Sequence, residues 1–570
     1  MMAKFLQNRF FPFFLIFSIA LLFTLPQIIS GGMIIGSDAI FHFNRFYDTA
    51  MQIKTGNIHY FLTTFGFQQT GRIINPFYGP LMAYIQGLLV IISGSWFRYQ
   101  ILANFILYFI SGVSMFSLLK CNKVTLKINL FTSILFMTTY SVHYWTIGQC
   151  FSGWGAAFLP FALIPLRKMV LEGKIAIVQI GFSVALMMQI HLFSCLLLIL
   201  IYFIFFIYSW WKNQHKIQMI RDITLSVLLF SLLTANIWVN MLHLYLTNEI
   251  LPPFINQSLD SNTIDRSSWY WLANPIFLVP IIICQFKCLF SRQQKLSQVN
   301  KMASMTAIFF LVLSSSLIPW KFLMSQKIKI VELIQFPFRF FIPFTVLILF
   351  SFALSLEENS LQRKAYSKYR QPVILLSLVQ VLLTISYALG LWLLNDIHYF
   401  ESLHTHIQPI DSQVIKDSFH QNDLAKGLSY WEKSTPDYLP LYQKTEQNKY
   451  QLYEKLILEQ HRQFEKKSCK EGLRIEWTSQ GKETTNLPII LYQNSQLIVN
   501  GQEISPQKTT LSEIGTPTIK QVSGKNYAIL TYKAPSYFTG SLRLTLISWL
   551  ILCLYAVFSI IKRSSGGHFF

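Results

Sequence analysis

The segment LFSCLLLILIYFIFFIYSWW, residues 192–211, contains no charged side chain. An α-helix rises 1.5 Å per residue, so about 20 apolar residues cross the roughly 30 Å hydrocarbon core of a lipid bilayer. Buried helices of soluble proteins are usually shorter, at about 10 to 14 apolar residues. The segment therefore predicts a membrane-spanning helix.

The composition of the whole chain agrees with a membrane protein. Its 570 residues are 52% hydrophobic and 13% charged, whereas soluble domains average roughly a quarter charged. We predict an α-helical polytopic membrane protein, with the lipid bilayer as its partner. Lys4 and Arg9 precede the first apolar run without a clear cleavage site after it, which indicates an uncleaved first helix. About twelve spans are predicted, near residues 11–30, 99–119, 128–146, 152–170, 174–190, 192–211, 222–243, 269–290, 303–319, 337–356, 372–394 and 542–561.

The net charge of +21 comes from lysine and arginine in short loops between the apolar runs. This placement is the positive-inside pattern of membrane topology, and it argues against a nucleic-acid-binding patch. The short segment 79–93 decides the orientation. If it does not cross, nearly every basic cluster is cytoplasmic, whereas crossing would put the clusters up to Arg370 outside. We therefore expect 79–93 to lie on the surface or to re-enter, with the N- and C-termini cytoplasmic in a multi-pass protein of the cell membrane.

Loop lengths divide the chain into a membrane part and one large water-facing domain. The membrane part covers residues 1–394, with an external loop at 31–78. An extracytoplasmic domain follows at 395–541, and a last helix with a short cytoplasmic tail occupies 542–570. From about residue 470, apolar and polar residues alternate, as in LRIEWTS, which predicts strands. We expect an α/β or β-sandwich domain on the membrane face.

The first external loop carries the residues best suited to chemistry, in GSDAIFHFNRFYDTA at 36–50. Spacings of four, three and three place Asp38, His42, Arg45 and Asp48 on one face of a helix. Ionisable groups at a membrane surface are costly unless they are paired or functional. Asp38 beside His42 could act as a general base on a hydroxyl group, or help to hold a divalent metal. The alternative is a solvated loop whose charges pair with each other or with lipid headgroups.

A second outward loop departs from the charge rule. Lys321, Lys327 and Lys329 lie on the predicted outer side, just before QFPFRFF at 335–341. Basic residues are uncommon on that side, so we interpret the cluster as a candidate ligand site. Arg339 in the same stretch could stabilise a departing phosphate, or it could simply reach toward the interface.

Several motifs resemble the GT-C superfamily of membrane glycosyltransferases. They are SDAIFHFNR at 37–45, NPFYGPLMAYIQGLL at 75–89, SLLKCNKVTLKINLFTSILFMTTYSVHYW at 117–145, MQIHLFS at 188–194, IQFPFRFF at 334–341 and WEKSTPDYLP at 431–440. The resemblance is closest to the bacterial membrane family labelled "6-pyruvoyl-tetrahydropterin synthase-related" and to the YfhO-type membrane glycosyltransferases. It spans nearly the whole chain, including an outward β-rich domain before the last helix.

The resemblance implies transfer of a sugar from a polyprenyl-phosphate carrier to an envelope glycan, teichoic acid or lipid at the outer face. Asp38 occupies the position of the catalytic base, with His42 beside it. Relatives commonly carry an Arg and a Glu after the helix that here ends near Trp145, whereas this chain has GQCFSGWGAAFLP. No carboxylate replaces that Glu, so a metal is possible but not required. The candidate substrate-binding residues are Arg45, Asp48, His191, Lys321, Lys327, Lys329, Gln335 and Arg339.

Two other classes of function remain alternatives. A transporter or flippase of envelope precursors would show broken helices or symmetric repeats. The sequence contains no evident repeat, and its ionisable groups gather at one membrane face. A non-catalytic envelope scaffold would keep the fold while its external domain binds a partner, and the missing Glu is compatible with that reading.

Overall fold

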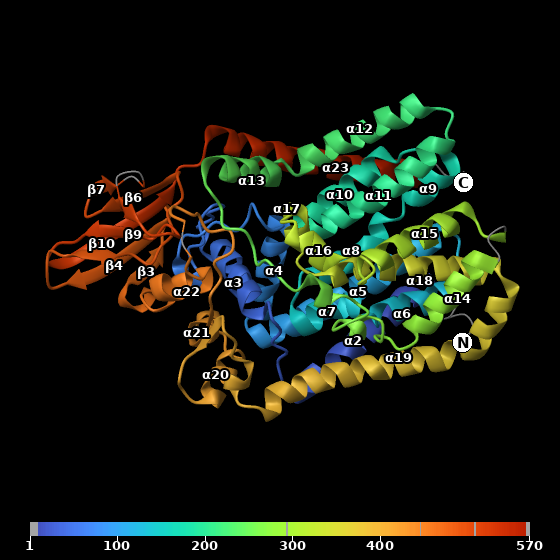
Figure 1. Ribbon diagram of the computed structural model, residues 1–570, viewed down its shortest axis with the longest axis horizontal. Helices are drawn as coiled ribbons and strands as arrows, with labels where there is room; N and C mark the ends of the chain where they lie inside the picture. Colours follow the sequence, from blue (N-terminus) through green and yellow to red (C-terminus); the bar gives the residue numbers. More distant parts are fainter. Residues whose placement is uncertain (1–8, 292–294, 445, 505, 507–508, 566–570) are drawn as a thin grey trace.

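The computed structural model describes residues 9–291, 295–444, 446–504, 506 and 509–565. Most of these residues are helical, and nearly all strands lie in the last third of the chain. The helices form an elongated bundle, with the sheets at one end of it (Figure 1). The predicted helical class and the strand-rich region near the C-terminus are therefore confirmed.

Among the described residues, seven helical segments are long and apolar enough to cross a membrane. An eighth arises if α12 (Lys216–Leu233) and α13 (Ala235–Thr247), which meet at 74°, form one bent span. Part of α19 (Ser360–Leu394) and most of α23 (Ser536–Ser565) belong to this set. The seven segments are Phe11–Ser30 (α2), Trp96–Cys121 (α5), Ser152–Glu172 (α8 and α9), Leu192–Lys212 (α11), Pro337–Glu358 (η5 and α18), Tyr366–Leu394 and Ser536–Ser559.

The other predicted spans coincide with shorter helices, which accounts for the difference from twelve. A turn at Thr138 and Thr139 divides the segment 128–146 into two helices. A helix of 14 residues is about 21 Å long, less than the hydrocarbon core. The segment 79–93 forms a helix of this kind, with one face buried and the other exposed. These shorter helices are α4 (Pro80–Ser93), α6 (Leu126–Met137), α7 (Tyr140–Gly148), α10 (Ile177–Ile190), α14 (Leu278–Ser291) and α15 (Gln298–Leu313).

Hydrogen bonds show that the loops gather at two opposite ends of the bundle. At the end away from the strands, Thr125 bonds Glu357, Asn213 bonds Gly173, and Tyr208 bonds Gln298. At the end near the strands, Asp38 bonds Gly148, and Arg45 bonds Gly79. Both α2 and α23 run the length of the bundle between these ends (Figure 1).

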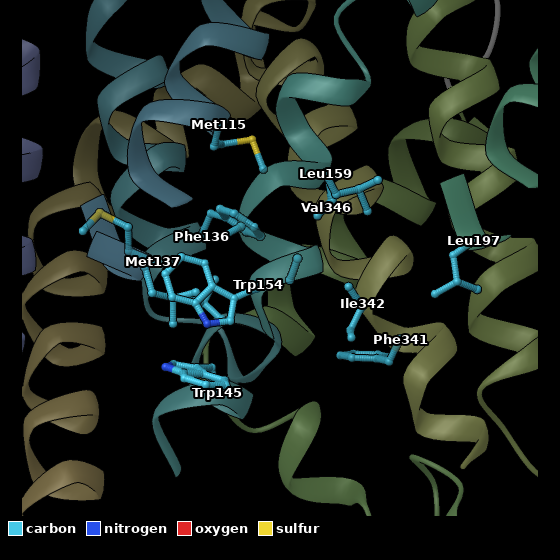
Figure 2. Close-up of a cluster of buried hydrophobic side chains, with 14 of the residues drawn as sticks. Met115, Phe136, Met137, Trp145, Trp154, Leu159, Leu197, Phe341, Ile342 and Val346 are labelled. Atoms are coloured by element: carbon cyan, nitrogen blue, oxygen red, sulfur yellow. The ribbon is translucent and has the colours of Figure 1, made fainter. Parts of the chain in front are cut away.

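The helices pack around α18 (Phe341–Glu358), in which every residue from Phe341 to Leu356 is buried. Such an all-round apolar helix fits only the centre of a bundle. Figure 2 shows part of this core, where side chains from α5, α6, α7, α8, α11 and α18 converge. The labelled side chains are Met115, Phe136, Met137, Trp145, Trp154, Leu159, Leu197, Phe341, Ile342 and Val346.

Within the described residues, the strand-rich part contains three antiparallel sheets. A five-stranded sheet has the order β3-β4-β10-β6-β7, and a three-stranded sheet has the order β5-β9-β8. Both contribute to one apolar core, in which Leu473, Leu530 and Ile519 are buried. A separate hairpin pairs β1 (Thr405–Ile407) with β2 (Trp431–Lys433). The other strands are β3 (Glu465–Ser468), β4 (Leu473–Ser479), β5 (Thr484–Asn486), β6 (Ser495–Val499), β7 (Gln502–Ile504), β8 (Thr510–Leu511), β9 (Pro517–Lys520) and β10 (Gly524–Tyr532).

The loop at residues 31–78 joins this part to the helices. Arg72 is 1% exposed and donates to the carbonyl oxygens of Thr435 and Asp437. A buried arginine with carbonyl partners on another segment resists displacement, because unpaired buried donors are costly. The helices α20 (Ser412–Ser418) and α21 (Leu424–Tyr430) lie between the sheets and the end of α19 (Figure 1). The bundle and the strand-rich part therefore meet over α3 (Ala39–Thr55).

Candidate functional site

Asp38 stands at the start of α3, where the chain leaves α2. Its backbone N–H donates to Gly148 O at 3.2 Å, and its Oδ2 accepts from Cys150 Sγ at 3.4 Å. Gly36 permits this approach, because a Cβ at that position would lie 2.4 Å from Ile147 O. The Asp38 side chain is partly exposed. The carboxylate is thus held between α3 and the turn that joins α7 to α8.

His42 lies one turn further along α3 and is buried. Its ring stacks on Phe46 at a centroid distance of 5.7 Å and contacts Phe151 at 4.7 Å. Burial lowers the pKa of His42 well below its usual value, and the charges of Arg45 and Lys433 lower it further. The imidazole is therefore neutral near pH 7. Its Nδ1 has no hydrogen-bond partner within the described ranges.

Arg45 is 2% exposed and lies on the next turn of α3. Its Nη2 donates to Gly79 O at 2.8 Å, and the guanidinium lies 5.2 Å from the centroid of the Tyr78 ring. Burial lowers the pKa of Arg45 to about 10, so the group stays charged at neutral pH. Its Nε and Nη1 lack a partner among the residues that the structure describes. These donors are free to receive an anion.

Arg339 belongs to the short helix η5 (Pro337–Phe340) that leads into α18. Its Nη1 donates to Gln335 Oε1 at 2.7 Å, while Gln335 Nε2 donates to Phe254 O at 2.7 Å. The guanidinium also lies 5.5 Å from the centroid of the Phe193 ring, at the start of α11. In the part of the chain that is described, its Nε has no partner. Gln335 therefore orients Arg339 and leaves it a free donor.

His191 forms the junction between α10 and α11, and the charges of both Arg339 and Arg45 act on it. Its Nδ1 accepts the N–H of Ser194 at 3.3 Å and so caps α11. Burial lowers the pKa of His191 to about 3, and the charges of Arg339 and then Arg45 add to this effect. Asp38 and Arg339 in turn both interact electrostatically with Tyr144 of α7. Asp38, His42, Arg45, His191 and Arg339 are thus brought together from three chain segments.

Two predicted features lie apart from this cluster. The Asp48 carboxylate instead contacts the loop 31–78. Its Oδ1 accepts hydrogen bonds from the N–H groups of Thr64, Phe65 and Gly66 at 2.9 to 3.2 Å. Burial raises the pKa of Asp48 to about 6 despite these bonds. The structure also places Lys321, Lys327 and Lys329 as exposed side chains along α16 (Trp320–Ser325) and α17 (Lys329–Ile334).

Three residues at the site were missed by the sequence analysis. Cys150 contacts Asp38 directly, and burial raises the pKa of its thiol, which is therefore protonated. Tyr144 faces both Asp38 and Arg339. Lys433 of β2 donates from Nζ to the carbonyl oxygen of Ser37. Cys150 lies in GQCFSGWGAAFLP, the stretch that differs from the resembled family, and this difference could have drawn attention to it. Nothing in the sequence pairs residue 433 with residue 37.

The donor set around Asp38 does not suit a divalent metal. The Asp38 carboxylate contacts a protonated thiol, the other charged groups of the cluster are two guanidinium groups, and hard cations such as Mg²⁺ require several oxygen ligands. Within the described ranges, no three His, Cys, Asp or Glu side chains are placed to hold a metal ion. The arrangement instead suits an anion at the arginines and a hydroxyl group at Asp38.

The fold and this cluster define a mainly helical protein with several helices able to cross a membrane and a polar site at one end of the bundle. No protein-family model matches the chain, and no curated protein matches it either.

Proposed function

We propose that the protein is a membrane glycosyltransferase that moves a sugar from a polyprenyl-phosphate carrier to a cell-envelope acceptor. The observation that carries this proposal is the convergence of Asp38 with Arg45 and Arg339 at one end of the bundle. Sugar transfer from a lipid phosphate needs a base for the acceptor hydroxyl and cations for the departing phosphate. These three side chains supply both.

The chemistry follows from the positions of these groups. Asp38 takes the proton of the acceptor hydroxyl while the oxygen of that hydroxyl bonds to the anomeric carbon of the sugar. The bond from that carbon to the phosphate oxygen breaks, and its electron pair leaves with the polyprenyl phosphate. Arg45 and Arg339 stabilise that charge with their free N–H donors. His42 and His191 are neutral and add no opposing charge to the acceptor side.

We further propose twelve crossings, with both termini cytoplasmic and the strand-rich domain outside. Support comes from the loops that gather at the end away from the strands, near basic residues such as Lys120, Lys123 and Lys212. The shorter helices would then cross where neighbouring helices cover them. In this arrangement the Lys433 contact makes the external domain a cover over Asp38.

The bent pair of α12 and α13 supports a second candidate, a transporter of envelope precursors, because broken helices are typical of transporters. The backbone groups freed at the break between α12 and α13 already have hydrogen-bond partners within the protein. Leu233 O accepts from Gln189 Nε2 at 3.3 Å and from Trp549 Nε1 at 2.9 Å. The Asn236 N–H donates to Thr545 Oγ1 at 3.0 Å. The break therefore offers less to a cargo than the Asp38 cluster offers to a reaction.

The test compares envelope glycans from cells that express wild type, Asp38→Asn or Arg339→Ala at equal protein levels. Asp38→Asn should lower transfer by about a hundredfold or more, since general base catalysis contributes that much. Arg339→Ala should lower it by roughly tenfold or more, as loss of one charge-assisted bond predicts. Matched controls are Asp260→Asn and Arg266→Ala, which remove a surface ion pair and should leave the glycans unchanged. Wild-type glycans in both site variants would overturn the transferase proposal and favour a scaffold or transporter.

A further inference from the structure

A polar pocket of about 250 Å³ lies where α2 and α19 end, against α20. This volume is well above the roughly 30 Å³ that one water occupies in the liquid. The chain leaves α2 at Gly31, and the last turns of α19 contribute Trp392. Both helices belong to the set that can cross a membrane. Because the pocket lies at their ends, it lies at the level where hydrocarbon gives way to lipid headgroups.

The exposed surface beside the pocket is apolar. Leu383, Tyr387 and Leu394 are exposed along α19, and Leu394 is 87% exposed. The apolar surface continues beyond the helix with Leu403 at 93% exposure and with Val414 of α20. Large apolar side chains with this exposure are unfavourable in water. The lipid-facing surface of α19 thus extends past its end, and the outer part of a lipid leaflet is the partner that fits it.

Charges of both signs line the pocket. Lys416 Nζ donates to Asn395 O at 2.6 Å and lies 5.7 Å from the centroid of the Trp392 ring. An ammonium group has three N–H donors, so two remain after the Asn395 bond. Asp417 is exposed and accepts from Gln413 Nε2 at 2.8 Å with one of its two oxygens. The ammonium group of Lys416 and the carboxylate of Asp417 therefore both line this pocket, at the level of the lipid headgroups.

We infer that this pocket binds the headgroup of a phospholipid that carries a primary ammonium, as phosphatidylethanolamine does. Lys416 receives the phosphate, Asp417 receives the ammonium, and the acyl chains follow the exposed face of α19. A choline headgroup has no N–H to donate to Asp417. A glycerol headgroup carries no cation for Asp417, so this carboxylate only repels the phosphate that Lys416 receives. This inference does not depend on the proposed transferase activity.

The test uses the purified full-length protein in detergent, titrated with dihexanoyl phosphatidylethanolamine, phosphatidylcholine or phosphatidylglycerol. Binding is followed by native mass spectrometry. Wild type should bind the ethanolamine lipid about tenfold more tightly than the other two, as one additional charge-assisted hydrogen bond predicts. Lys416→Gln should weaken binding of all three lipids. Asp417→Asn should abolish the preference for ethanolamine over choline while phosphate binding persists.

The matched control is Lys426→Gln on α21, whose Nζ donates to the side chain of Gln421 at 3.4 Å. It should bind the ethanolamine lipid like wild type. Equal affinity of wild type for the ethanolamine and glycerol lipids would overturn the inference, and so would unchanged preference in Asp417→Asn. If Lys416→Gln does not fold, the exposed Asp417 still provides the decisive comparison.

Discussion

At the residue scale, the Cys150 thiol and the Asp38 carboxylate form the contact that defines the site. They are separated by 112 positions in the chain and joined at 3.4 Å in the fold. The Cys150 sulfur also lies 3.5 Å from Gly148 O, so its single S–H hydrogen lies within reach of both oxygens. A protonated thiol offers a hydrogen bond without adding charge, so it can orient a carboxylate that must accept a proton.

Removing this donor should change the reaction more than the fold. Cys150→Ala should lower the transfer rate by about twofold to tenfold, the range expected for one net hydrogen bond. Cys150→Ser keeps a donor and should restore the rate. Cys195→Ala is the control, since that buried thiol on α11 donates to Val184 O at 3.5 Å. An unchanged transfer rate in Cys150→Ala would show that the contact does not position Asp38.

At the element scale, β3 is fastened to the loop 31–78 by a partly buried lysine. Lys466 Nζ donates to Gln68 O at 2.9 Å and to Pro488 O at 2.8 Å. Gln68 lies in η1 (Phe67–Gln69), whose three residues all have φ between 53° and 54°. Residues other than glycine rarely adopt this backbone conformation, so the turn depends on hydrogen bonds from outside it, such as the one from Lys466.

The lysine gives this junction a pH dependence. Burial lowers the pKa of Lys466 to about 7. The folded protein then binds fewer protons than the unfolded chain between pH 7 and about 10.4, the ordinary lysine value. Stability should therefore rise with pH in this window, by at most about 1.4 kcal/mol per pH unit from this group. Thermal unfolding of the detergent-solubilised protein at several pH values measures this slope. Lys466→Met should flatten it, whereas Lys467→Met on the exposed face of β3 should not.

The same scale shows what the sequence predicts and what it leaves open. Long apolar runs such as 192–211 predict helices, because the bilayer sets their length and composition. The break at Thr234 is not predicted, since the residues around it stay apolar and the freed backbone groups find partners on α10 and α23. For the site, helical spacing places Asp38, His42 and Arg45 together on α3. It also groups Asp48 with them, and that carboxylate bonds the 64–66 turn instead. Hydrogen bonds from other chain segments, which helical spacing does not predict, therefore decide which residues of α3 belong to the site.

At the scale of the whole molecule, the two ends of the bundle differ in the chain segments that they contain. Asp38, Arg339 and the sheets lie at one end, while the loop after α5 and the loop after α11 lie at the other. The proposed orientation puts the first end outside the cell. This orientation depends on α4, because a true crossing there would reverse the side of every later loop and of the strand-rich part.

Labelling with a membrane-impermeant maleimide on whole cells tests this orientation. The background carries Cys121→Ser and Cys469→Ser, because Cys121 lies close in the chain to Lys123 and Cys469 belongs to the same strand-rich part as Gln502. Cysteine introduced at Lys123, after α5, should be protected until the membrane is permeabilised. Cysteine introduced at Gln502, in β7, should react at once, since that side chain is exposed on the strand-rich domain. The background alone measures the remaining thiols. Labelling at Lys123 in intact cells would make α4 a true span. Because each crossing inverts the side of all that follow it, every later loop and the strand-rich part would then lie on the opposite side, and Gln502 would be protected.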